Sequence, residues 1–420
     1  MQNKKFPKNM TSFFSKNTFN SGLFFFFVLF SIFVLRPFRN TIAANIGTAD
    51  LPIYLILIVF LMLVANTVYS LVVSRISLKN LVQSIYGFFI ICLGAFLLIY
   101  SYFPENNAIK STFYVWYNIF NFFIVAIFWA MTVNSYDIED GKKFFGIISA
   151  FGSLGASFGG LLVDNYLYDK ENLSLMITVA SLLLAIYFSS RVQRKKVNLN
   201  FSSETNLSSS FEQFSQIKSN PLIRKFILYA FVWTSLSTAL WFFQLEIINS
   251  YTNDSDIKTK IFGRADSIVP LLTLSIQLLL TSSILRSKYF GIKFVLSIYG
   301  VIFSCAFLAI SGYFSEYLLA SSGVLVFLVL QGVIRPFEYG LNKPAREAIY
   351  TTLTSKEKYK STVFIDTFTN RFGDATGGLL FNLLLTLGFV MYTAPLALIP
   401  LCLFLVYLGL SISESVKSVK

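Results

Sequence analysis

The sequence contains no histidine and only three cysteines, and charged residues make up 13% of it. The cysteines lie far apart within apolar stretches, at Cys92, Cys305 and Cys402, so neither a disulfide framework nor a metal site is expected. The sequence also lacks a Walker A pattern and a recognisable pairing of a nucleophile with a base. These absences argue against an enzyme, and no cofactor is expected.

Apolar residues dominate the composition of the chain. They make up 55% of the chain, the mean hydropathy is +0.65, and Phe alone occurs 47 times. Apolar runs of about 20 residues recur along the whole length, and each is long enough to cross a bilayer core of about 30 Å as a helix. The sequence therefore predicts an all-α integral membrane protein. The predicted spans are residues 19–39, 51–74, 80–103, 112–134, 144–164, 173–190, 223–248, 260–284, 291–313, 317–342, 361–386 and 389–412.

The positive charge of the chain follows its membrane topology. Most of the 34 Lys and Arg fall on one side of the bilayer if these twelve spans are correct and the N-terminus is cytoplasmic. The net charge of +13 is therefore the positive-inside bias and not a nucleic-acid-binding surface. We expect a multi-pass protein of the cell (inner) membrane with both termini in the cytoplasm. We expect the protein to contact the lipid bilayer and to be a monomer.

An unusual polar line lies in the eleventh predicted span, within the stretch Asn342–Asn382. Asp366, Asn370 and Asp374 are four residues apart and so share a helix face, and Arg371 lies next to that face. Ionisable groups are costly in hydrocarbon, and they normally face a bundle interior or a water-filled path. This line therefore predicts a transport path.

The first span carries a second candidate site. Arg36 and Arg39 flank Pro37 near its outer end, where the proline predicts a bent or locally unwound helix. The two arginines either extend to the membrane interface or present their charge to an anionic ligand. In the eighth span, Asp266 lies one turn inside and is a candidate partner for Arg264 or for an arginine of the first span.

A weak internal repeat indicates two halves. Shifting the chain by 218 residues superimposes several residues of the fifth span on the eleventh, and six-helix halves of this kind are the plan of major facilitator carriers. The predicted regions are an N-terminal half (1–190), a cytoplasmic linker (191–221) and a C-terminal half (222–420). Within the repeat, the glycines are spaced for close helix packing. The superimposed pairs are Glu139 with Glu357, Lys142 with Lys360, Gly155 with Gly373, Gly159 with Gly377, and Gly160 with Gly378.

Three blocks resemble the nucleotide translocase family, the ATP/ADP exchangers of plastids and intracellular bacteria, together with their bacterial facilitator-like relatives. They are LRPFRN at 35–40, FWAMTVNSYDIEDGKKFFGIISAFGSLGA at 128–156, and QGVIRPFEYGLNKPAREAIYTTLTSKEKYKSTVFIDTFTNRFGDATGGLL at 331–380. The resemblance implies a twelve-span facilitator bundle that exchanges nucleotides across a membrane. The substrate-binding residues that it implies are Arg36, Arg39, Arg346, Asn370 and Arg371. The exchangers also carry an acidic residue early in the fourth span, and this chain has none between Lys110 and Asp137.

The leading hypothesis is a secondary transporter of the major facilitator type that exchanges or imports an anionic phosphorylated metabolite such as a nucleotide. Arginines suit this ligand because they bind phosphate and carboxylate oxygens in pairs of charged hydrogen bonds. Asp266, Asp366 and Asp374 are then expected to pair with the arginines or to carry a coupling proton. Two alternatives remain: a proton-coupled transporter of another organic anion or small solute, and a non-transporting membrane sensor or assembly protein on a carrier fold.

Overall fold

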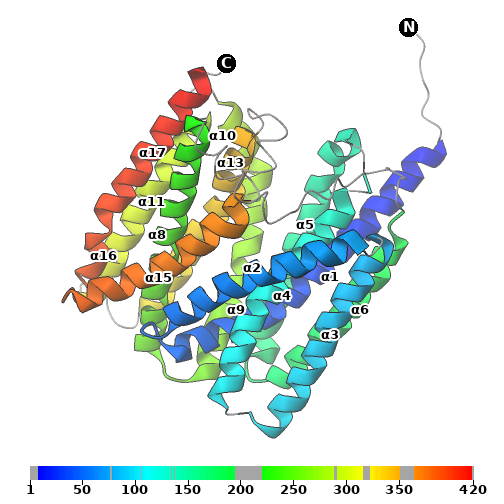
Figure 1. The fold of residues 1–420 in the computed structure, drawn as a ribbon, viewed down its shortest axis with the longest axis horizontal. Helices are drawn as coiled ribbons and strands as arrows, with labels where there is room; N and C mark the ends of the chain where they lie inside the picture. The colour runs from blue at the N-terminus through cyan, green and yellow to red at the C-terminus, as the bar shows by residue number, and fades with distance from the viewer. Residues whose placement is uncertain are drawn as a thin grey trace. The chain divides into compact units, whose positions relative to one another are not determined.

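Every regular element in the described part of the chain is a helix (Figure 1). The computed structural model describes residues 8–75, 78–104, 106–133, 135–136, 138–193, 220–287, 291–315, 322–350 and 364–418. The first part contains α1 (Lys8–Ile46), α2 (Leu51–Arg75), α3 (Leu78–Tyr102), α4 (Asn107–Val133), α5 (Ile138–Leu162), the π-helical turn η1 (Val163–Leu167) and α6 (Glu171–Arg191). The second part contains α8 (Pro221–Tyr251), α9 (Ser255–Ile276), η2 (Gln277–Thr281), α10 (Ser282–Arg286), α11 (Gly291–Phe314), α12 (Gly323–Phe337), η4 (Glu338–Asn342), α13 (Lys343–Tyr350), η5 (Ile365–Thr369), α15 (Asn370–Thr386), α16 (Ala394–Ala397) and α17 (Ile399–Ser418).

Ten helices among the described residues are long and apolar enough to cross a membrane. A helix lies at each predicted span, but the second and eleventh predicted spans are not among these ten. In α2, side chains are described only for Leu51–Ala65, and the first residues of the eleventh predicted span lie outside the described part of the chain. The chain is therefore an all-helical, multi-pass membrane protein, and the count of twelve spans remains a prediction.

Contacts divide the chain into two units. Unit 1 comprises Met1–Ile42, Val68–Ser202 and Thr259–Leu271, and unit 2 comprises Ala43–Thr67, Ser203–Lys258 and Leu272–Lys420. Two short segments therefore do not follow the predicted halves. Ala43–Thr67 lies in the predicted N-terminal half but belongs to unit 2, and Thr259–Leu271 lies in the predicted C-terminal half but belongs to unit 1. The predicted boundaries at 190 and 222 remain a prediction, and most of the predicted linker lies outside the described residues.

Close helix packing in unit 1 depends on the glycines of α5. A methyl group built at Gly155 would overlap the carbonyl oxygen of Phe26 in α1, and one built at Gly159 would lie 3.0 Å from the carbonyl oxygen of Phe30. Only a residue without a side chain lets the two backbones approach this closely. The core between α1 and η1 is filled by Val34, Phe38, Val163 and Leu167.

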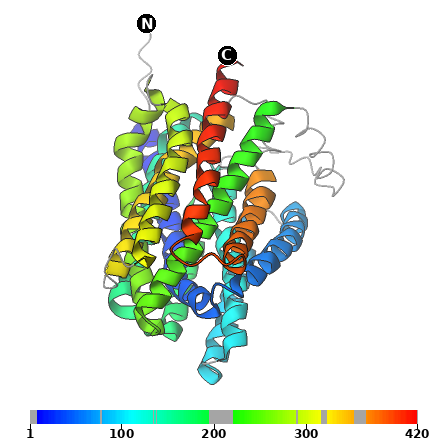
Figure 2. The ribbon, with the colours of Figure 1, turned by 90° about the vertical axis from the view of Figure 1, so that its left-hand side faces the viewer.

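Unit 2 repeats this packing with α15 and α8. A methyl group at Gly377 would overlap the carbonyl oxygen of Ser235, and one at Gly373 would lie 3.1 Å from that of Phe231. Figure 2 shows α17 running beside α8, and these two helices are in contact. The glycine contacts thus occur at matching positions of the predicted repeat, whereas Glu357 and Lys360 lie outside the described residues.

The first helix continues without interruption through Pro37. The predicted local unwinding is therefore wrong. Proline removes one backbone N–H, and packing of the apolar residues on both sides of it holds the remaining helix together. Arg36 and Arg39 consequently keep the positions that a regular helix gives them.

Candidate functional site

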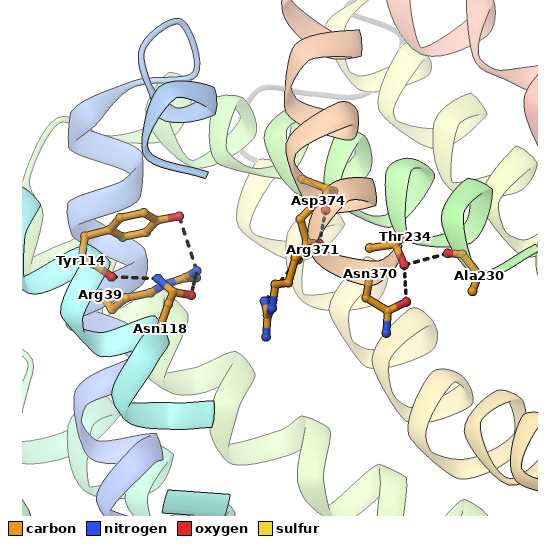
Figure 3. A network of polar contacts seen from close by, with 9 residues as sticks. Arg39, Tyr114, Asn118, Ala230, Thr234, Asn370, Arg371 and Asp374 are labelled. Carbon is orange, nitrogen blue, oxygen red and sulfur yellow. Dashed lines mark hydrogen bonds and ion pairs between the residues drawn. The ribbon is translucent and has the colours of Figure 1, made fainter. Parts of the chain in front are cut away.

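Arg39 in α1 is held entirely by neutral groups of unit 1 (Figure 3). Its Nη1 donates to Asn40 Oδ1 at 2.9 Å, and its Nη2 donates to Asn118 Oδ1 at 2.9 Å and to Tyr114 Oη at 3.4 Å. The guanidinium also lies 4.7 Å from the centre of the Tyr114 ring. Asn118 donates its own N–H to the Tyr114 carbonyl oxygen at 2.7 Å, which turns its side-chain oxygen toward the arginine. The result is a fixed cation without a carboxylate partner among the described residues.

Arg36, one turn earlier, is held differently. Its Nη1 lies 3.5 Å from Oδ1 of Asp266 in α9, and the Asp266 side chain is 9% exposed. The neighbouring Arg264 instead pairs with Asp164 of η1 at 3.3 Å. Of the two partners considered from the sequence, the structure therefore pairs Asp266 with the arginine of the first helix. Both positive charges are compensated within unit 1.

In unit 2, the polar line of α15 faces α8. Thr234 donates to Asn370 Oδ1 at 3.2 Å, and Thr238, one turn later, donates to Asp374 Oδ1 at 2.8 Å. Arg371 Nη1 lies 3.2 Å from Asp374 Oδ2 (Figure 3). Asn370 and Asp374 thus lie on one helix face, as their spacing requires, and both contribute to packing against α8. The side chain of Asp366 lies outside the described part of the structure.

Arg346 in α13 lies over an aromatic ring. Its guanidinium lies 4.6 Å from the ring centre of Trp233, which is 6% exposed. Its Nε is buried and finds no hydrogen-bond acceptor among the described residues, and the same is true of the Nε atoms of Arg39 and Arg371. No carboxylate pairs with Arg346 in that part of the chain.

The four predicted arginines therefore fall into two classes. Arg36 and Arg371 each have an aspartate within ion-pair distance, so their charge is largely compensated. Arg39 is held by amide and phenol groups, and Arg346 lies over an indole ring with Glu338 near enough to act on its charge. Neither has a carboxylate within ion-pair distance among the described residues.

A polar recess in unit 2 was not predicted as a site from the sequence. It is lined by two aliphatic side chains and by five polar or aromatic residues, which we call the amide recess: Ser237, Trp241, Gln244, Gln331 and Arg335. Gln331 donates to Gln244 at 2.5 Å, and Arg335 lies 3.3 Å from Glu338. Two buried glutamines in apolar helices are a signal in the sequence, but nothing there shows that they face each other.

Two π-helical turns lie beside these polar groups. Glu338 begins η4, and Asn370 directly follows η5. A π turn inserts an extra residue into a helix and frequently occurs at functional sites. The helical periodicity of the sequence gives no indication of either turn. No cluster of His, Cys, Asp or Glu in the described residues has the composition for a metal site.

Comparison with known proteins gives the fold but no family. No family model and no curated protein matches this sequence. Among solved structures, a mutant of the nucleoside transporter NupG superimposes with a TM-score of 0.64 at 13% identity, over 95% of this chain and 99% of that one. The chain has the fold of transporters.

A bacterial homologue of the human lysosomal transporter Spinster, in an inward-facing and unoccupied conformation, superimposes with a TM-score of 0.55 at 13% identity, over 97% of this chain and 94% of that one. A second NupG structure gives a TM-score of 0.55 at 14% identity, over 97% of this chain and 98% of that one. All three of these neighbours are transporters, and at 13–14% identity the likeness shows the fold alone.

Proposed function

We propose that this protein is a secondary transporter that exchanges or imports an anionic, phosphorylated metabolite such as a nucleotide. The observation that carries the proposal is that two arginines, Arg39 in unit 1 and Arg346 in unit 2, have no carboxylate within ion-pair distance among the described residues. Unpaired cations in membrane helices are costly unless a ligand or a path uses them. The transporter fold supplies the path, and the resemblance to nucleotide translocases supplies the ligand class.

The fixed charges favour exchange over net uptake. An empty carrier leaves Arg39 and Arg346 without an anion, and bringing an uncompensated charge into a low dielectric costs several kcal/mol. An anion on either side removes that cost, so the loaded protein changes conformation more readily. We also propose the two six-helix repeats of the major facilitator plan and both termini in the cytoplasm, on the glycine repeat and the positive-inside bias.

The binding part of the proposal is tested by thermal unfolding of the purified protein in detergent with a panel of solutes. The panel contains ATP, ADP, other nucleotides, inorganic phosphate, sugar phosphates and dicarboxylates. A ligand present at 100 times its dissociation constant stabilises the folded protein by about 2.7 kcal/mol. We expect a shift with phosphorylated compounds that is lost in Arg39→Gln and in Arg346→Gln.

The matched control is Arg191→Gln. Arg191 also lies over an aromatic ring, Tyr187, but at the exposed end of α6. Equal shifts in all three variants would show that the site arginines are not those proposed. A flat panel with the wild-type protein would remove the anionic substrate and reopen the non-transporting alternative.

The exchange part is tested in proteoliposomes loaded with the solute that gives the shift. Efflux is expected to need the same solute outside, because the return of the empty carrier is slow. Equal efflux into solute-free buffer would contradict the exchange mechanism and leave binding intact.

A second candidate is proton-coupled transport, which the buried carboxylate of Asp266 favours. The residue Asp266 is 6% exposed, and its side chain lies beside Arg36 in unit 1. A carboxylate in this position can take up a proton when the arginine engages a ligand. If Asp266→Asn leaves the pH profile of transport unchanged, Asp266 is not on a proton path.

A further inference from the structure

Asn118 of α4 has one fixed orientation beside Arg39 (Figure 3). Its Nδ2 donates to the carbonyl oxygen of Tyr114, four residues earlier in the same helix, at 2.7 Å, and its Oδ1 accepts from Arg39 Nη2 at 2.9 Å. Exchanging the amide nitrogen and oxygen would place a donor against the arginine and an acceptor against the carbonyl group. The amide therefore presents its oxygen, and only its oxygen, to Arg39.

This contact orients Arg39 without removing its charge. The bonds to Asn40, Asn118 and Tyr114 occupy only part of the N–H donors of the guanidinium, and all three partners are neutral. Arg39 and Asn118 are both half-buried, so neither side chain is sealed in the core of unit 1. The arginine thus keeps its full positive charge in a fixed position.

The charges around Arg39 do not cancel. Arg36, Arg39 and Asp266 all lie near enough to Tyr117 to act on it. Asp266 pairs with Arg36 at 3.5 Å, and no carboxylate of the described residues lies within ion-pair distance of Arg39. Aspartate has nearly the shape of asparagine, so an acid at position 118 would place a carboxylate oxygen where the amide oxygen now lies, 2.9 Å from Arg39 Nη2. The choice between amide and acid at this one position decides whether Arg39 is neutralised.

We propose that Asn118 determines the charge selectivity of the unit 1 arginine site, which consists of Arg39 with Asn40, Tyr114 and Asn118. As an amide it holds Arg39 ready for the oxygens of an anion, whereas an acid would occupy the arginine itself. Asn118 is a positioning residue, because it acts on the ligand through Arg39. This inference rests on the proposed function, and it assigns the charged, phosphate-bearing part of the solute to unit 1.

The test changes the charge of this side chain and keeps its size. Asn118→Asp and the uncharged Asn118→Leu are compared with the wild type as purified full-length proteins. The probes are ADP, inorganic pyrophosphate and adenosine, so that charge and base are tested separately. The control is Asn165→Asp at an exposed position of η1, where the amide also donates to the carbonyl oxygen four residues earlier, that of Leu161, at 2.8 Å. Both acidic variants lose this bond, but only position 118 faces Arg39.

Asn118→Asp is expected to lower the affinities for ADP and pyrophosphate about tenfold to a hundredfold, the size of one lost charge-assisted contact. Adenosine binding should not change. Asn118→Leu should lower the two affinities by less, because Arg39 keeps its charge. The order of stability is expected to be the reverse: Asn118→Asp should unfold at a higher temperature than Asn118→Leu, because only the aspartate pairs with Arg39. In an Arg39→Gln background this advantage should disappear.

The outcomes separate this inference from the proposed function. If Arg39→Gln loses binding while Asn118→Asp binds ADP and pyrophosphate like the wild type, the inference is overturned and the arginine site stands. Equal losses in Asn118→Asp, Asn118→Leu and Asn165→Asp, or an Asn118→Asp protein that fails to fold when Asn118→Leu folds, also overturn it. A wild-type protein that binds neither charged probe overturns both the inference and the proposed function.

Discussion

The ion pair between Arg36 and Asp266 allows a quantitative prediction. The two atoms lie 3.5 Å apart, and the side chains are 26% and 9% exposed. At an effective dielectric constant of about 20, two unit charges at this distance attract by about 5 kcal/mol. Removing one partner of a buried pair typically costs about 3–5 kcal/mol, because the other charge stays buried without compensation. Since a quarter of the Arg36 side chain is exposed, we expect Asp266→Asn to destabilise the protein by about 2–3 kcal/mol.

The double variant Arg36→Gln/Asp266→Asn distinguishes pairing from simple packing. Neither charge remains, so it should be less destabilised than either single variant. The assay is the midpoint of thermal unfolding in detergent at one scan rate, followed by tryptophan fluorescence. Asp169→Asn is the control, because Asp169 pairs with Lys170 only at 3.9 Å with both side chains about half exposed, and its change should stay within about 0.5 kcal/mol. A double variant whose loss equals the sum of the two single losses would refute the reasoning.

Three further predictions concern unit 2. Gly377→Ala should destabilise the protein by about 1–3 kcal/mol or prevent its insertion, because the added methyl group meets the carbonyl oxygen of Ser235. Gel filtration of the detergent extract measures this effect. The control is Gly146→Ala, where the added methyl group meets nothing within 4 Å. Arg371→Ala should abolish transport in proteoliposomes, because it leaves the Asp374 carboxylate without its ion-pair partner. The protein should remain folded and inserted, because both side chains of this pair are more than a quarter exposed and the pair adds little stability; wild-type transport rates would show that this arginine is dispensable. Thr238→Val should lower stability by about 1–2 kcal/mol, because it removes the hydroxyl group that donates to a carboxylate; an unchanged unfolding midpoint would contradict that role.

Arginines with and without an aspartate partner should respond differently to substitution. From the sequence, Arg36 and Arg39 are equally good candidates for binding an anion, because both lie near Pro37 at the end of an apolar helix. In the structure, an aspartate neutralises the first and neutral groups hold the second. Loss of function in an Arg36 variant is therefore expected to accompany loss of stability, whereas an Arg39 variant should lose ligand binding first.

The membrane class, the position of each helix and the glycine faces could be predicted from the sequence. These features depend on local periodicity and composition: an apolar run of sufficient length forms a helix in lipid wherever it occurs, and small residues at regular spacing mark a packing face. The Asn370 and Asp374 face was predictable for the same reason, since a spacing of four residues fixes the direction of side chains within one helix.

The partners of those side chains were not predictable. Asp266 is 230 residues from Arg36, and Gln331 is 87 residues from Gln244, and no local rule relates residues at such distances. The π turns η4 and η5 were also not predicted from the sequence. A single inserted residue changes the spacing of apolar residues too little to be recognised in the helical periodicity of the sequence. The sequence alone determined that charged groups lie inside a helical membrane protein. Only the tertiary structure decided which of them have an ion-pair partner among the described residues, because ion pairing depends on distances of a few ångströms between helices far apart in the chain.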